Sequence, residues 1–200
     1  MSENDEVKKE TPFVNLIGES VSLGPLCRHL PYQRWLSDFT TTRTVGKSRP
    51  MTQEQAVAWY ERHATNEREA WFVIYERATW NPIGVTGLMD IDAENRRAEF
   101  GIIIGEPDAR GKGYGTEVAR LMLDYAFTAR GFHNVWLTVN AYNLAGLRAY
   151  EKAGFRACGR RRECRFMGGK LWDQIFMDCL ATDFTSPVLH HIFAPDQPRN

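Results

Sequence analysis

The chain has 200 residues, which fits one globular domain, and its 43% hydrophobic and 25% charged residues exclude a largely disordered protein. The 25 Lys and Arg side chains balance the 25 Asp and Glu side chains, so the sequence lacks the cationic excess of proteins that bind DNA or anionic membranes. No apolar run reaches the roughly 18 residues of a membrane-spanning helix, and the mixed-charge first ten residues lack the apolar stretch of a signal peptide.

The four cysteines indicate a reducing compartment. They form no C-x-x-C pair and have no histidine at a zinc-site spacing, so we expect reduced thiols and no metal site. They are Cys27, Cys158, Cys164 and Cys179. Together with the lack of a targeting segment, this predicts a cytoplasmic protein.

Both ends of the chain lack a regular pattern. Residues 1–13 are expected to form a flexible leader, and prolines at positions 187, 195 and 198 predict a C-terminal tail at residues 185–200. The segment between them, residues 14–184, is the predicted domain.

The first predicted elements are a short strand at residues 21–26 and a helical segment at residues 31–39. A capping box, in which Thr52 and Gln55 satisfy early backbone amides, begins the next helix. Behind it, apolar and aromatic residues recur at the spacing of one helical face. They are Ala56, Trp59, Tyr60 and His63.

Three strands are predicted next, at residues 71–75, 83–91 and 98–104, as an antiparallel meander. A turn-prone Trp-Asn-Pro sequence at residues 80–82 joins the first two. From there the pattern changes to strand, glycine loop, helix and strand.

The second half begins with a long helical stripe at residues 116–129, followed by a strand at residues 134–140. A helix at residues 144–152 ends at Gly154, a residue suited to a left-handed C-cap. Two final strands flank a Gly-Gly hairpin turn at residues 168–169. The elements predict an α/β (α+β) domain whose mixed sheet is antiparallel first and contains one parallel crossover.

A glycine-rich loop lies between the strand ending at Ile104 and the helix beginning near Thr116. Its glycines permit a tight turn with uncovered amides, and these amides join the free donors of the helix start in a site for anionic oxygens. The spacing fits neither a P-loop nor a dinucleotide fingerprint. We therefore expect a pyrophosphate site, with a loop that only turns the chain as the alternative. The glycines are Gly111, Gly113 and Gly115, and the added charges are Arg110 and Lys112.

Two segments then resemble one family. Residues 110–115, with the sequence RGKGYG, resemble the R/Q-x-x-G-x-G/A signature of the GNAT superfamily of N-acetyltransferases. Residues 143–155, NLAGLRAYEKAGF, resemble its second signature, with Gly146 in place of the family's Ala or Ser. The resemblance extends over residues 16–184 and is closest to the ribosomal-protein and spermidine N-acetyltransferase branches.

The resemblance implies a mixed, mostly antiparallel central sheet with flanking helices and a splayed parallel strand pair. The pantetheine arm of acetyl-CoA would enter between these strands, and a backbone amide near Ile102 or Ile103 would polarise the thioester carbonyl. The residues implied to bind acetyl-CoA are Ile102, Ile103, Ile104, Arg110, Gly111, Lys112, Gly113, Tyr114, Gly115, Thr116 and Asn143.

The same resemblance implies a proton donor, and positions on the predicted strands give candidates for a general base. Tyr150 would protonate the departing thiolate, and a core aromatic is the alternative for this residue. Glu99 is the preferred base, with Asp90 and Glu94 as further candidates, and a structural ion pair with Arg96 or Arg97 is the alternative.

The implied function is direct transfer of an acetyl group from acetyl-CoA to a primary amine of a small molecule: a polyamine, an aminoglycoside or other amino-sugar antibiotic, or an amino acid. A protein N-terminus and a non-catalytic CoA-binding module are the alternatives. No DNA or membrane partner is expected, and a homodimer stays open. Aromatic residues are candidates for the acceptor pocket, with core packing as the alternative. They are Trp35, Tyr60, Trp71 and Trp172.

Overall fold

The computed structural model describes residues 11–46 and 48–196. Eight strands form one sheet in the order β1-β2-β3-β4-β5-β6-β8-β7, antiparallel except for the pair β5 and β6. The strands are β1 (Leu16–Ile17), β2 (Val21–Pro25), β3 (Ala70–Glu76), β4 (Asn81–Asp92), β5 (Arg97–Ile104), β6 (Asn134–Asn140), β7 (Arg156–Met167) and β8 (Lys170–Leu180). This confirms the predicted mixed sheet with one parallel crossover.

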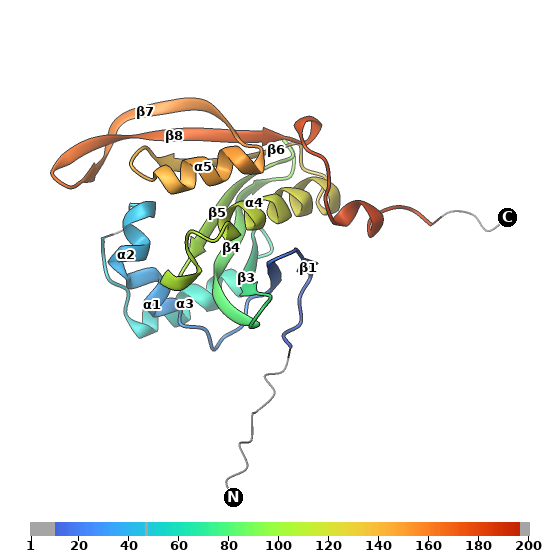
Figure 1. Cartoon of the computed structure of the whole chain (residues 1–200), viewed down its shortest axis with the longest axis horizontal. Coiled ribbons are helices and arrows are strands. Elements are labelled where there is room, and N and C mark those ends of the chain that lie inside the picture. The colour runs from blue at the N-terminus through green and yellow to red at the C-terminus, as the bar shows by residue number, and fades with distance from the viewer. Residues whose placement is uncertain (1–10, 47, 197–200) are drawn as a thin grey trace, which may run out of the picture.

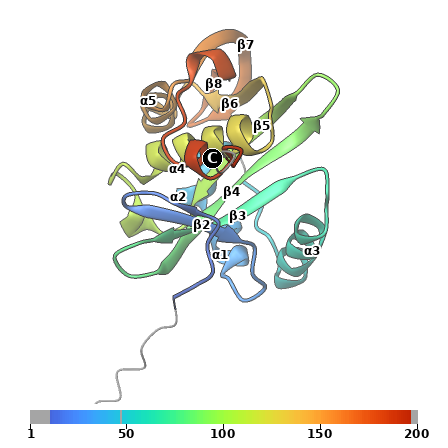
Figure 2. The same cartoon turned by 90° about the vertical axis from the view of Figure 1, so that its right-hand side faces the viewer.

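Within residues 11–46 and 48–196, five α-helices lie on the two faces of this sheet. They are α1 (Tyr32–Ser37), α2 (Phe39–Thr42), α3 (Gln53–Ala64), α4 (Tyr114–Asp124) and α5 (Leu144–Ala153). Figure 2 shows α3 on one side of the sheet and α4 with α5 on the other. The capping box predicted at Thr52 and Gln55 begins α3, with hydrogen bonds of 3.0 and 3.2 Å.

Strand alternation divides the core between these two faces. Ala98 and Phe100 of β5 belong to the large cluster under α4 and α5, whereas Ile103 packs on the smaller cluster of α1, α3 and β4. Trp35 of α1 is fully buried in the smaller cluster. The same strand therefore carries one set of side chains toward α4 and α5, and another toward α1 and α3.

The strands β7 and β8 form a long hairpin that projects beyond α5 (Figure 1). Its turn contains Gly168 and Gly169, both with positive φ, as the Gly-Gly sequence predicted. Among the described residues, no helix is both long and apolar enough to cross a membrane.

The packed body continues past Phe184, which was the expected end of the domain. A 3₁₀ turn at Leu189–His191 follows, and Leu189 is buried in the large core cluster. The Asp124 carboxylate of α4 accepts hydrogen bonds of 2.9 Å from the backbone amides of Val188 and Leu189. Part of the segment predicted as a tail is thus an integral part of the fold.

Candidate functional site

The parallel strands β5 and β6 pair over a short stretch and then separate. Their register ends where Glu99 lies opposite Trp136, although β5 continues to Ile104 and β6 to Asn140. A regular parallel pair would close the space beyond with hydrogen bonds. The strands instead leave a gap whose backbone edges can bind an extended ligand.

The backbone groups that face this gap follow from strand alternation. The Gly101 carbonyl accepts a hydrogen bond of 2.9 Å from the Thr86 hydroxyl on the β4 side. Because successive residues of a strand point their N–H and C=O groups to opposite neighbours, Ile103 also faces β4 and Ile102 faces the gap. Of the two amides that the sequence singled out, only that of Ile102 is turned toward a ligand in the gap.

The glycine loop ends in an open cradle of backbone amides at the start of α4. Gly111 and Gly113 adopt φ values of 76° and 87°, and Gly113 is the N-cap of the helix. A Cβ at Gly111, Gly113 or Gly115 would meet nothing within 4 Å. Within the described residues, the amides of residues 111–115 have no protein acceptor. Amides free at a helix N-terminus suit the oxygens of a diphosphate.

The Arg110 side chain folds back from this loop onto the end of β5. Its Nε donates to the Ile104 carbonyl at 3.2 Å, and a terminal nitrogen donates to the Gly105 carbonyl at 3.3 Å. The same guanidinium hydrogen-bonds the Thr41 hydroxyl of α2. Arg110 therefore ties the loop to the strand end and to α2, whereas its backbone remains part of the cradle.

Lys112 is the loop cation that an anion can reach, and Glu76 at the end of β3 holds it. The Lys112 ammonium lies 3.5 Å from the Glu76 carboxylate, which also accepts a hydrogen bond of 2.8 Å from the Tyr114 hydroxyl. The Tyr114 hydrogen bond is the main cause that lowers the pKa of Glu76. No local sequence pattern marks Glu76, because only the fold brings it to a loop residue 38 positions away.

Glu99 is half-buried on the sheet face of α1 and α3, directly beside the start of the gap. Burial raises the pKa of its carboxyl, and the negative charge of Asp90 adds to the effect. The alternative of a structural ion pair does not apply: among the described residues Arg97 pairs with Asp92 at 3.2 Å, and Arg96 binds a backbone carbonyl. The carboxylate is thus free to accept a proton.

Tyr150 of α5 lies on the opposite face. Its ring packs edge-on against Phe100 and Phe155, with centroid distances of 6.0 and 6.1 Å. Burial raises the pKa of Tyr150 to about 12, and its hydroxyl has no hydrogen-bond partner within the described part of the chain. The ring is thus part of the core edge, while its hydroxyl keeps a proton that it can donate.

Asn143 caps α5, and its Oδ1 accepts a hydrogen bond of 3.0 Å from the Gly146 amide. A Cβ at Gly146 would come within 2.6 Å of the Asn143 Nδ2. The departure from the family's Ala or Ser at position 146 therefore leaves room for this cap. Asn143 is thus the N-cap of α5, and a contact of Asn143 with acetyl-CoA stays a prediction.

The four aromatic candidates for the acceptor pocket lie in different places. Trp35 is fully buried, which fits the alternative of a core residue. Tyr60 stacks against an aromatic ring of α1, and Trp172 contacts a tyrosine after β6. Trp71 is partly exposed and shares the sheet face of Glu99. Only Trp71 is therefore both accessible and registered across the sheet with the strand that carries Glu99.

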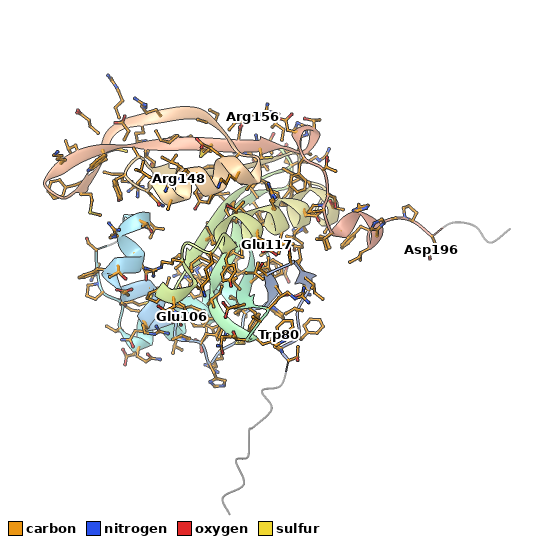
Figure 3. The ribbon with its side chains drawn as sticks, in the orientation of Figure 1. Trp80, Glu106, Glu117, Arg148, Arg156 and Asp196 are labelled. Atoms are coloured by element: carbon orange, nitrogen blue, oxygen red, sulfur yellow. The ribbon has the colours of Figure 1, made fainter. Side chains whose placement is uncertain are left out.

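Glu117, in the first turn of α4, serves the fold (Figure 3). Its carboxylate accepts hydrogen bonds from the backbone amides of Ser20 and Val21, at 2.9 and 3.4 Å. It thereby fixes the β1–β2 turn to the helix that follows the glycine loop. We assign it no chemical role.

Comparison with known proteins agrees with these features. The model of the acetyltransferase (GNAT) domain matches residues 27–156. Spermidine N(1)-acetyltransferases of Vibrio cholerae and Escherichia coli K12 are 36% and 33% identical over 57% and 59% of the chain. The matches span 65% and 62% of those two relatives, less than two thirds of their length. A human alpha/beta-tubulin N-acetyltransferase is 27% identical over 70% of the chain and 74% of its own length.

A solved structure resembles most of the chain. The Vibrio cholerae spermidine N-acetyltransferase in complex with CoA and spermine superposes with a TM-score of 0.73 at 27% identity. The likeness covers 82% of this chain and 97% of that one.

Proposed function

The chain belongs to the GNAT acetyltransferase family, and we propose that it transfers the acetyl group of acetyl-CoA to a primary amine on a small molecule. The transfer is direct, in a ternary complex, without a covalent enzyme intermediate. The observation that carries this proposal is the gap between β5 and β6, which has Glu99 on one face and Tyr150 on the other. Among polyamines, amino-sugar antibiotics and amino acids, the spermidine relatives favour a polyamine.

The residues around the gap fit acetyl-CoA as co-substrate. The amides of residues 111–115 and the Lys112 ammonium bind the diphosphate, and the backbone edges of the gap bind the pantetheine arm. The Ile102 amide donates to the thioester oxygen, where negative charge develops during attack. Asn143 adds a side chain at the wide end of the gap. The backbone supplies most of these contacts.

Glu99 acts as the base. An alkylamine with a pKa near 10.4 is only about 0.1% neutral at pH 7.4, so the acceptor must lose a proton before it can attack. A half-buried carboxylate with a raised pKa is a better proton acceptor than an ordinary surface carboxylate. Glu99 takes this proton directly or through one water molecule.

Tyr150 acts as the acid. Its pKa of about 12 keeps the phenol protonated at neutral pH, and a thiolate with a pKa of about 8.5 develops as the C–S bond breaks. The Tyr150 hydroxyl, free of a protein partner among the described residues, donates its proton to that sulfur. Starting from the ammonium, the nitrogen loses two protons in all. The first leaves through Glu99 to solvent before attack, and the second, lost as the amide forms, balances the proton that Tyr150 gives to the thiolate.

The test is release of free thiol from acetyl-CoA with a panel of primary amines, followed by the product masses. We expect thiol release and an amine heavier by one acetyl group, with the strongest signal among polyamines. CoA binding without thiol release from any amine would instead indicate a non-catalytic CoA-binding module. The tubulin N-acetyltransferase relative makes an N-terminal peptide the second acceptor class to include, and acetylation of the peptide alone would replace the small-molecule acceptor.

A further inference from the structure

A patch of two glycines lies on the sheet face beside Glu99. Trp71 of β3, Gly87 of β4 and Gly101 of β5 are registered across three neighbouring strands, and Glu99 is two residues from Gly101 on the same face. The next strand position is the gap. The side chains that lie over these two glycines therefore border the approach to the gap on this face.

The Trp71 indole lies flat on this patch. A Cβ at Gly87 would come within 2.6 to 3.0 Å of three Trp71 ring atoms, so position 87 must be glycine for the ring to lie there. On the next strand, a Cβ at Gly101 would meet the Met89 Cε at 2.7 Å. The two glycines thus make room for an indole and a thioether, which form an apolar wall beside Glu99.

A carboxylate behind the indole fixes its orientation. The Trp71 Nε1 donates to the Glu69 Oε2 at 2.7 Å, and the same oxygen contacts the His63 Nδ1. Trp59 packs edge-on against Trp71 with a centroid distance of 5.3 Å. A ring held on its N–H edge and on one face keeps its remaining accessible surface in a constant position.

That surface suits a cation. The face of an indole attracts ammonium groups with about 0.5 to 2 kcal/mol, and donation of its N–H to a carboxylate places negative charge behind the ring. The indole lies one to two strand spacings from the gap, which is roughly 5 to 10 Å. Two nitrogens separated by a short alkyl chain span this distance.

We propose that Trp71, held against Gly87 by the Glu69 carboxylate, is a specificity-determining residue that selects acceptor amines with a second cationic group. The inference rests on the proposed acetyl transfer at the gap. The reacting nitrogen lies beside Glu99, the alkyl chain runs along the Met89 side chain, which lies over Gly101, and the second ammonium lies on the Trp71 ring. An amine of the same length with an apolar end loses only the contact between the second ammonium and the Trp71 ring.

The test compares 1,5-diaminopentane with 1-aminohexane. The two amines have the same length and differ only at one end, which is an ammonium group in the first and a methyl group in the second. We expect kcat/KM to favour the diamine about tenfold, in line with the strength of a cation–π contact. Trp71→Leu should reduce this preference to near unity by raising the KM of the diamine, with the KM of acetyl-CoA unchanged. Trp71→Phe should keep part of the diamine preference. Glu69→Gln should lower this preference while the Trp71 ring stays in place.

Trp80→Leu is the matched control, because Trp80 lies in the β3–β4 turn, at the end of β3 away from Trp71 (Figure 3). It should leave the preference unchanged. A diamine preference that survives Trp71→Leu would overturn the inference.

Binding separates this inference from the proposed function. Titration with 1,5-diaminopentane, followed by the NMR signal of the Trp71 indole N–H, reports the contact without any acetyl transfer. Saturable diamine binding with no acetylation would overturn the proposed function and leave only the contact between the cation and Trp71. Acetylation of both amines with no change at the Trp71 signal would keep the function and overturn the inference.

Discussion

Glu99 of β5 and Trp136 of β6 form the last registered pair before the two parallel strands separate. The carboxylate therefore lies at the closed end of the gap, next to the last backbone pairing of the two strands. A short register is a backbone property, yet it decides which side chains meet a ligand in the gap. On one face the neighbour is Glu99, and on the other Phe100 supports the ring of Tyr150.

Replacement of Glu99 tests its role as the base. Burial and Asp90 raise the pKa of Glu99, so its carboxylate form is lost at a higher pH than that of an exposed glutamate. At saturating acetyl-CoA and diamine, kcat should rise with pH through this raised pKa and then level off. Glu99→Gln should lower kcat by about 10²-fold and remove that rise. If kcat of the variant still rises with pH, the rise would instead reflect deprotonation of the bound amine.

The proton donor can be tested on the other face. Tyr150→Phe keeps the edge-on packing with Phe100 and removes only the hydroxyl, so kcat should fall by about 10²-fold with little change in acetyl-CoA affinity. Because the pKa of Tyr150 is about 12, wild-type activity should show no loss of this acid up to about pH 10. Tyr125→Phe, on the π-helical turn after α4, is the control that should leave kcat unchanged. Equal turnover of the Tyr150 variant would exclude the phenol as donor.

The amide cradle predicts loss of binding upon a single substitution. A valine at position 113 is strained at a φ of 87° and covers the amides at the start of α4 with a branched side chain. We expect Gly113→Val to abolish CoA binding measured by calorimetry. Gly131→Val is the matched control, because Gly131 also has positive φ and open space around its Cβ position. Both variants should lose about 1 to 2 kcal/mol of stability, and only the first should lose affinity.

Much of the fold and part of the site follow from local sequence signals. The strand predicted at residues 134–140 has those bounds, and the helix predicted at 144–152 ends one residue later. Two glycines of the RGKGYG segment have positive φ, as the expected tight turn requires. Backbone conformation and alternation are properties of neighbouring residues, so one sequence suffices to predict them.

The features that the sequence could not show depend on register and packing. The backward fold of Arg110, the contact of Glu76 with the loop and the row of Trp71, Gly87 and Gly101 each join distant segments. No local pattern marks a glycine whose missing side chain makes room for an indole two strands from the gap. Such contacts are fixed only when the strands align.

The anchoring of the C-terminal segment gives a stability prediction. The Asp124 carboxylate is fully buried and accepts hydrogen bonds from two hydroxyls, of Thr128 and Ser186, and from the amides of Val188 and Leu189. Asp124→Ala leaves the two amides without an acceptor, so we expect a loss of about 3 kcal/mol in the free energy of unfolding in urea.

Asp124→Asn separates charge from hydrogen bonding at this anchor. Its amide oxygen can still accept from the Val188 and Leu189 amides, and its NH₂ group can donate to the two hydroxyls after they rotate. We therefore expect a loss of about 1 kcal/mol or less, and protected amides in hydrogen exchange, which Asp124→Ala should expose. Replacement of the exposed Glu67 by alanine should change neither quantity. If both Asp124 variants keep wild-type stability and protection, Leu189 packs without the carboxylate, and the C-terminal segment is held by its apolar contacts alone.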